Sequence, residues 1–224
     1  MWVSRREQVG TVGGGAFEHL VVREARELIS RRPRALLQEV SAHLTHELGM
    51  CCGGKMSALL KLYPAPERVY VMGAGHVGTA LAKQLTLLER AVTVVDERAE
   101  WASPERFSQE VSVRCEDPES WLRASPPQGG GALLIMTHDH ELDERLMSLA
   151  LPLLERGELS YLGMIGSAGK WGRFKRRLKE RGFSEALLEH VRCPVGLSIG
   201  AESPAEIAVS VCAELIEGWR AAQR

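Results

Sequence analysis

The chain has 224 residues, enough for one well-packed domain or for one domain with a smaller appendage. Its 28 basic and 29 acidic residues nearly cancel, so bulk charge gives no argument for binding nucleic acid or a membrane surface. No apolar stretch approaches the roughly 20 residues that span a bilayer. Five cysteines, two of them adjacent, make a poor disulfide framework and favour a reducing cytoplasm. The composition therefore predicts a cytoplasmic α/β protein.

Residues 1–64 predict a small α+β domain. The pattern indicates a polar hairpin that runs into three glycines, a helix over residues 18–32 and a strand within residues 55–63. This is little apolar material for an independent core. We therefore expect the small domain to pack against the larger one or against a second chain, which predicts a homodimer.

Residues 65–224 predict a Rossmann-like α/β domain with a parallel sheet. The domain contains short apolar runs without alternation, as is typical of strands buried on both faces. These runs are residues 69–72, 91–96, 132–136 and 161–166. Between them, leucines and valines recur every three or four residues, which is typical of helices packed on a sheet. Because strand and helix alternate, we expect parallel strands with right-handed crossovers.

The last helix has a clear start signal. Ser203 can cap it, Pro204 suits its first position, and Glu206 completes a capping box. We therefore expect this helix to begin at Pro204 and to bury one apolar stripe.

Three glycines follow the run at residues 69–72 with the spacing of a dinucleotide-binding turn. Gly73 allows the tight turn, Gly75 lets a pyrophosphate approach the backbone, and Gly78 lets the helix pack closely on the strand. Free N–H groups at the helix start would then hold a phosphate. Asp96 ends the next strand, where an acidic side chain bonds a ribose 2′-hydroxyl. The motif predicts NAD(P) binding and an oxidoreductase, unless the glycines serve only the turn and its packing.

A dehydrogenase also needs a group that transfers a proton. Thr137, His138, Asp139 and His140 directly follow the run at residues 132–136, at the strand end where such sheets bind ligands. These side chains could supply a general base or a metal site. The alternative is a polar loop in which Asp139 or Thr137 caps the next helix. We favour the loop because His-x-His with nearby acids is not a specific metal spacing, and keep His138 and Asp139 as candidate cofactor-binding residues.

Residues 48–56 form the least ordinary stretch, in which two adjacent cysteines precede two glycines. Its candidate binding residues are Cys51, Cys52, Gly53 and Gly54. Adjacent glycines can form a nest of N–H groups, and a thiol beside a nest and a lysine ionises more readily than a free cysteine. A redox-sensitive thiol and a plain turn are the alternatives to a binding site.

A second nest is expected at the triple glycine, which consists of Gly13, Gly14 and Gly15 and opens the helix that carries Glu18. Two nests, one of them beside a soft thiolate, suit an anionic ligand that carries both a phosphate and a soft metal.

Taken together, these motifs resemble the XdhC/CoxI family, accessory proteins of xanthine dehydrogenase and related molybdenum hydroxylases. The resembling segments follow the family's order over nearly the whole chain, at residues 10–18, 48–56, 71–82, 137–146, 161–170 and 194–216. The Cys-Gly-Gly segment and the final segment are more specific than the Rossmann glycines. The double cysteine, with no cysteine after the triple glycine, is closer to the xanthine dehydrogenase branch.

The resemblance implies a binding protein rather than an enzyme. Members of the family hold the molybdenum cofactor (molybdopterin), support its sulfuration by a cysteine desulfurase and deliver it to the apo-hydroxylase. Cys52 matches the family's single cysteine, which implies a contact with molybdenum, and Cys51 is the extra cysteine of the branch. An NAD(P)-dependent oxidoreductase is the alternative that the Rossmann glycines favour.

Three further expectations concern the rest of the chain. Family members usually carry an additional segment before the strand that residues 1–10 match, so the resemblance implies a small domain that is short of strands. Residues 169–182 carry seven basic residues in a helical pattern. They form either a solvated helix face or a surface that docks an acidic partner or the phosphate of the cofactor. Residues 193–203 either line the cleft opposite Gly73 or only route the chain.

Overall fold

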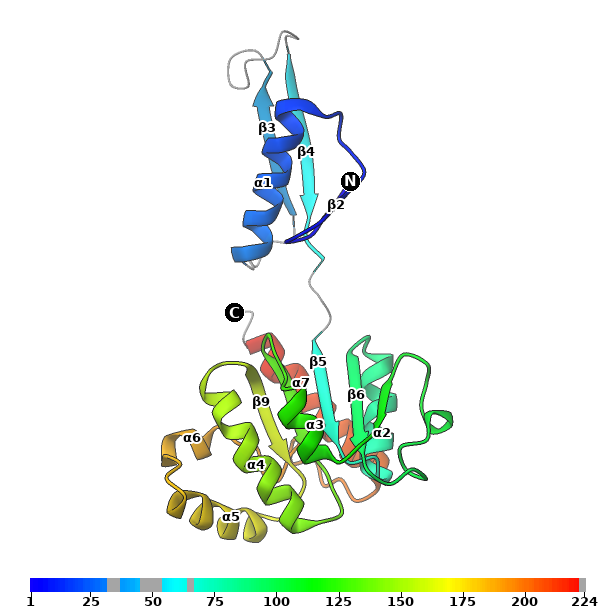
Figure 1. The fold of residues 1–224 in the computed structure, drawn as a ribbon, viewed down its shortest axis with the longest axis vertical. Coiled ribbons are helices and arrows are strands. Elements are labelled where there is room, and N and C mark those ends of the chain that lie inside the picture. The colour runs from blue at the N-terminus through cyan, green and yellow to red at the C-terminus, as the bar shows by residue number, and fades with distance from the viewer. Residues whose placement is uncertain (32–36, 45–53, 64–66, 222–224) are drawn as a thin grey trace. The chain divides into compact units, whose positions relative to one another are not determined.

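The computed structural model describes residues 1–31, 37–44, 54–63 and 67–221. The chain divides into two compact units, Met1–Ala65 and Pro66–Ala222 (Figure 1). They are named the small unit and the large unit, and each is described by itself. None of the helices in the described ranges has the length and apolar character to cross a membrane.

The small unit contains one helix, a short hairpin and a longer two-stranded ribbon. Strands β1 (Trp2–Val3) and β2 (Gln8–Val9) form the short antiparallel hairpin. Helix α1 (Gly15–Arg31) follows and packs on the antiparallel ribbon of β3 (Leu37–His43) and β4 (Lys55–Lys61). The helix expected over residues 18–32 therefore begins three residues earlier, within the triple glycine.

The core of the small unit lies between α1 and one face of the ribbon. Phe17 and Val21 of the helix are buried against Val40 and Ala42 of β3. Each large apolar side chain buried in this way contributes about 1.5–3 kcal/mol. Among the residues that the structure describes, these four side chains and Leu44 are the buried members of the core, which is small.

The large unit is built on a five-stranded parallel sheet in the order β7-β6-β5-β8-β9 (Figure 1). The strands are β5 (Arg68–Met72), β6 (Ala91–Asp96), β7 (Ser112–Cys115), β8 (Gly131–Ile135) and β9 (Leu159–Met164). Strand β5, the first strand of this sheet, lies at its centre. Strands β6 and β7 follow on one side of it and β8 and β9 on the other, so the strand order reverses between β5 and β8. The predicted Rossmann-like α/β fold is confirmed.

Helices cover both faces of this sheet. They are α2 (His76–Leu87), α3 (Pro118–Ala124), α4 (His140–Glu155), α5 (Ala168–Glu180), α6 (Glu185–Glu189) and α7 (Pro204–Ala221), with a short 3-10 turn, η1 (Pro104–Arg106). Successive side chains of β5 point to opposite faces. Val69 and Val71 join the core formed with α2 and α7, and Met72 joins the core formed with α3 and α4.

The start of α7 agrees with the sequence prediction. The helix begins at Pro204, and the Glu206 carboxylate accepts a hydrogen bond of 2.9 Å from the N–H of Ser203. The Ser203 hydroxyl in turn accepts one of 3.3 Å from the N–H of Glu206. These reciprocal bonds are the expected capping box.

Two strands, β3 and β7, are missing from the prediction for the same physical reason. Strand β3 has only two buried apolar side chains, Val40 and Ala42, and β7 has none. In this sheet β7 pairs only with β6, so it lies at an edge and needs no continuous apolar run. Such strands are fixed by pairing with neighbours rather than by their own hydrophobic pattern.

Candidate functional site

The candidate site lies where the strand order of the large sheet reverses. The chain leaves β5 through a glycine turn (Gly73–Gly78) that includes the first three residues of α2, and leaves β8 through a loop (Met136–Asp139) into α4. These two connections are called the switch point. Both follow the carboxyl ends of adjacent parallel strands, where open α/β sheets bind their ligands.

Two glycines of the turn are required by packing. Gly73 has φ +115°, and a Cβ atom there would lie 2.4 Å from the backbone oxygen of Met136. A Cβ at Gly78 would lie 2.1 Å from the backbone oxygen of Gly73. The turn therefore touches the end of β8 directly, and helix α2 sits close on β5, as the fingerprint predicts.

Gly75 differs from its neighbours because no protein atom demands a glycine there. Its φ is −63°, which any residue can adopt, and nothing lies within 4 Å of the Cβ that it lacks. It is the N-cap residue of α2, and within the described ranges no side chain caps that end of the helix. An external group can therefore approach the backbone at Gly75 and the first N–H groups of α2.

Asp96 supports the glycine turn from the neighbouring strand. Its Oδ2 accepts hydrogen bonds of 2.7 Å from the N–H of Ala74 and from Nη2 of Arg98. Its Oδ1 accepts bonds of 3.0 and 2.9 Å from the N–H and Nε of Arg98. Burial alone would raise the pKa of Asp96, but these hydrogen bonds outweigh it and hold the pKa below its ordinary value. A ribose hydroxyl would have to share a carboxylate that already accepts four bonds.

The loop after β8 is ordered by its own side chains. Asp139 caps α4, because its Oδ1 accepts a hydrogen bond of 2.7 Å from the N–H of Glu141, and this bond lowers the pKa of Asp139. The capping role considered from the sequence is therefore observed. His138 and His140 are exposed. In the described part of the chain, no group of three or more His, Cys, Asp or Glu side chains could hold a metal ion.

A buried ion pair holds this loop against α5. Lys170 Nζ lies 2.6 Å from Asp143 Oδ2, and the two side chains are 8% and 0% exposed. Asp143 Oδ1 accepts a hydrogen bond of 2.7 Å from the Thr137 hydroxyl. Asp143 was not considered in the sequence analysis. Lys170 was counted among the basic residues expected on a solvated or docking face, and for Lys170 this is wrong because its side chain is buried beside Asp143. Cys193 lies near the pair, and burial raises the pKa of its thiol to about 11, so it is a poor nucleophile.

The glycine nest of the small unit is filled by the chain itself. Gly13, Gly14 and Gly15 all have positive φ, and the nest closes around the Glu18 carboxylate. Glu18 Oε2 accepts hydrogen bonds of 3.0 Å from the N–H groups of Val12 and Gly14, and a further one from the Thr11 hydroxyl. These bonds lower the pKa of Glu18 to about 2, the hydroxyl of Thr11 having the largest effect.

The predicted thiol site falls mostly outside the described residues. Cys51, Cys52 and Gly53 lie there, and only Gly54 is described. Gly54 has φ +116°, and its carbonyl accepts a hydrogen bond of 3.0 Å from the N–H of Leu44. The roles expected for this segment therefore stay predictions.

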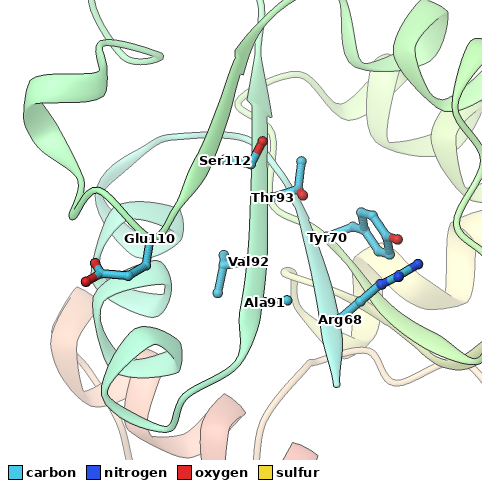
Figure 2. A pocket seen from close by; sticks show the side chains of 7 residues that line it. All are labelled: Arg68, Tyr70, Ala91, Val92, Thr93, Glu110 and Ser112. Carbon is cyan, nitrogen blue, oxygen red and sulfur yellow. The ribbon is translucent and has the colours of Figure 1, made fainter. Parts of the chain in front are cut away.

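A hollow of about 280 Å³ lies at the other end of the sheet (Figure 2). Arg68, Ala91 and Ser112, the first residues of β5, β6 and β7, line it together with Tyr70 and Thr93. The strands are parallel, so this hollow lies at their amino ends and the switch point at their carboxyl ends. It is not part of the candidate site.

The model of the XdhC Rossmann domain matches residues 69–215, well over half of the chain. The chain belongs to the XdhC family. The matched XdhC residues begin in β5, contain the whole switch point and end in α7.

Relatives of this XdhC chain extend the match beyond that domain. The uncharacterized protein YqeB of Escherichia coli is 32% identical over 93% of this chain and 38% of its own length. A probable xanthine dehydrogenase subunit of Bacillus subtilis is 32% identical over 70% of this chain and 44% of its own length. The chain therefore spans less than half the length of these relatives.

A solved structure has the same fold. The crystal structure of a xanthine dehydrogenase from Bacillus halodurans superimposes with a TM-score of 0.59 and 28% identity. The likeness covers 75% of this chain and 47% of that one.

Proposed function

We propose that this protein is an accessory protein of xanthine dehydrogenase or a related molybdenum hydroxylase. It binds the molybdenum cofactor, supports its sulfuration by a cysteine desulfurase and transfers it to the apo-hydroxylase. The observation that carries the proposal is membership of the XdhC family, with a Bacillus subtilis relative named as a probable xanthine dehydrogenase subunit. The free approach at Gly75 supports it, because a phosphate-bearing cofactor fits an uncapped helix start.

In this proposal the N–H groups at Gly75 and the start of α2 are the candidate binders of a phosphate group. The Cys52 thiolate, a prediction from the sequence, is the candidate contact for molybdenum. The bound cofactor supplies the redox chemistry only after it reaches the hydroxylase. The task of this chain is to bind it, orient it and keep water away from it.

Cofactor release gives the direct test. The full chain is purified from a molybdenum-sufficient host and denatured, and the released molecules are identified by mass spectrometry and metal analysis. We expect a pterin with molybdenum, and we expect the protein to activate apo-hydroxylase in a reconstitution assay. The Cys51→Ser, Cys52→Ser double variant should retain less cofactor, and unaltered retention would contradict the role of the thiolate.

An NAD(P)-dependent oxidoreductase is the second candidate function, favoured by the glycine turn and its uncapped helix. Two observations count against it: Asp96 already accepts four hydrogen bonds, and Asp139 serves as a helix cap. Titration with NAD and NADP separates the two functions. Tight binding accompanied by hydride transfer, with no pterin released, would overturn the accessory role.

A homodimer is part of the proposal. In the small unit, Leu59 and Leu37 are 70% and 55% exposed on the ribbon strands, and the core beneath them is small. A second copy that covers these side chains would bury the face of the ribbon opposite that core. Light scattering at micromolar concentration should show a dimer, and a monomer alone would contradict this assembly.

A further inference from the structure

An arginine beside the glycine turn has a charge that no acid neutralises among the residues that the structure describes. Arg106 ends η1, in the connection between β6 and β7, and is partly buried. Its Nη1 donates hydrogen bonds of 3.1 Å to the carbonyl of Ala74 and 2.7 Å to that of Trp101. Both acceptors are neutral, and Arg106 has no acidic partner within the residues that the structure describes.

The neighbouring arginine is in the opposite situation. Arg98 forms a bidentate ion pair with Asp96, and the negative charges of Glu97 and Glu100 also stabilise its positive charge. Its charge is therefore balanced before any ligand arrives. The excess positive charge next to the turn belongs to Arg106.

Arg106 is held in place rather than left to move. Its guanidinium carbon lies 4.6 Å from the centre of the Trp101 ring, and the His76 ring meets the same indole edge-on, with 5.0 Å between the ring centres. His76 is the first residue of α2. The indole therefore links the guanidinium to the uncapped start of that helix. A guanidinium fixed in this way loses little side-chain entropy when it binds an anion.

The remaining donors of Arg106 determine what it can bind. A guanidinium has five N–H donors, and the two carbonyls engage only Nη1. Nε and Nη2 have no partner among the described residues. Such paired donors match the oxygens of a phosphate group, and leaving a partly buried cation without a counter-charge is costly.

We propose that Arg106 is the residue through which the switch point selects a phosphorylated ligand. Its guanidinium pairs with a phosphate whose other oxygens accept the N–H groups at Gly75 and the start of α2. This deepens the proposed function and rests on it, since the phosphate is taken to be that of the carried cofactor. The shared chemistry is a phosphate ester, which is either a monoester or the pyrophosphate of a dinucleotide form.

Calorimetric titration of the full chain tests the proposal with phosphate, pyrophosphate, ADP and adenosine as probes. We expect the parent protein to bind at least one of the phosphate-bearing probes but not adenosine, and to bind more weakly as salt rises. Arg106→Gln should weaken binding by about tenfold or more, as for the loss of a charge-assisted hydrogen bond. Stronger binding of pyrophosphate than of phosphate points to the dinucleotide form, and equal binding points to the monoester.

Arg90→Gln is the matched control. Arg90 also lies over an indole, 4.7 Å from the centre of the Trp219 ring, but it precedes β6 at the amino ends of the strands. This variant should bind the probes like the parent. Arg106→Lys keeps the positive charge but not the paired N–H donors of the guanidinium, and should recover part of the binding that Arg106→Gln loses.

Several results would overturn the proposal. They are absence of binding to every phosphate-bearing probe, equal binding of adenosine and ADP, unchanged binding by Arg106→Gln, and no recovery by Arg106→Lys. Activation of apo-hydroxylase is a separate assay. Probe binding that depends on Arg106 while activation fails contradicts the proposed function alone, and activation without such binding contradicts this inference alone.

Discussion

The glycine turns of the small and large units both bring a backbone N–H to a carboxylate, but the carboxylates stand in different places. In the small unit, Glu18 lies inside the nest and accepts from Val12 and Gly14. In the large unit, Asp96 accepts a hydrogen bond from the N–H of Ala74, and the space around the missing Cβ of Gly75 is free of described atoms. The first turn is occupied by a carboxylate of the chain itself. The second is held by Asp96, but its backbone at Gly75 stays accessible to a ligand.

This difference shows that a glycine-rich motif does not by itself reveal a binding site. Both turns were predicted to bind anions. The triple glycine was expected to form a nest of N–H groups, and the turn of the large unit has the glycine spacing of a dinucleotide-binding motif at a helix start. Whether the N–H groups of a turn are free to bind a ligand depends on where the nearest acid lies. Glu18 follows its nest closely in the sequence and occupies it, whereas Asp96 contacts its turn from another strand and accepts only the N–H of Ala74. The following predictions test the comparison, from the largest effect on stability to the smallest.

The largest effect is expected from Gly73→Ala. The new methyl group would meet the backbone of Met136 at 2.4 Å in a residue with φ +115°, so unfolding free energy should fall by about 5 kcal/mol or more. Gly14→Ala is the control, since its φ is +73° but nothing lies within 4 Å, and it should cost about 1–2 kcal/mol. Urea unfolding monitored by tryptophan fluorescence measures both. Equal losses would show that the two turns are constrained alike.

The second effect concerns the ion pair that holds the loop opposite the turn. Lys170→Met leaves Asp143 buried without its counter-charge and should cost about 3–5 kcal/mol. Lys175→Met, on the same helix over the Trp171 ring, removes an ammonium without isolating an acid and should cost less than about 1 kcal/mol. The same unfolding measurement applies. A loss below that of the control would show that the pair does not stabilise the switch point.

The third effect is local and depends on pH. The pKa of Glu18 is lowered to about 2, so its contribution is fully present above its ordinary value of 4.5 and is lost as the pH falls towards 2. Hydrogen exchange should show the amides of Val12 and Gly14 protected at pH 5 and less protected in Glu18→Gln, because a neutral amide oxygen accepts more weakly than a carboxylate. Glu24→Gln, later on the same helix, is the control and should leave them protected. Unchanged protection in Glu18→Gln would mean that the nest is ordered by something else.

The smallest change in stability is expected from Gly75→Ala. With φ −63° and free space around the new methyl group, unfolding free energy should change by less than about 0.5 kcal/mol. Ligand binding should nevertheless be abolished, because the methyl group takes the place of the phosphate. Thermal unfolding and calorimetric titration together check this. A variant that still binds cofactor or dinucleotide would show that the turn of the large unit is not used.

The sequence predicted the parts of the fold that depend on local pattern. The buried runs of β5, β6, β8 and β9 and the capping box at Ser203 and Glu206 are each encoded within a few residues. The edge strand β7 was missed, because pairing with β6 fixes it.

The candidate site divides in the same way. The glycine spacing located the turn. The ion pair of Asp143 with Lys170, and the lack of an acidic partner for Arg106 among the described residues, depend on contacts between distant segments. No periodicity in a single sequence encodes such contacts. The ribose role predicted for Asp96 assumed a carboxylate without other partners. In the folded chain this carboxylate accepts four hydrogen bonds, which the sequence could not show.

The bond from Ala74 to Asp96 also couples two parts of any ligand bound at the switch point. A hydroxyl that takes a lone pair from Asp96 must weaken its hold on Ala74 or Arg98, and so loosen the turn on which a phosphate would rest. For a ligand that carries both a hydroxyl and a phosphate, binding at Asp96 would therefore lower the affinity at the turn, by the same factor in both directions. A sugar fragment and a phosphate fragment should accordingly bind together less well than the sum of their separate free energies.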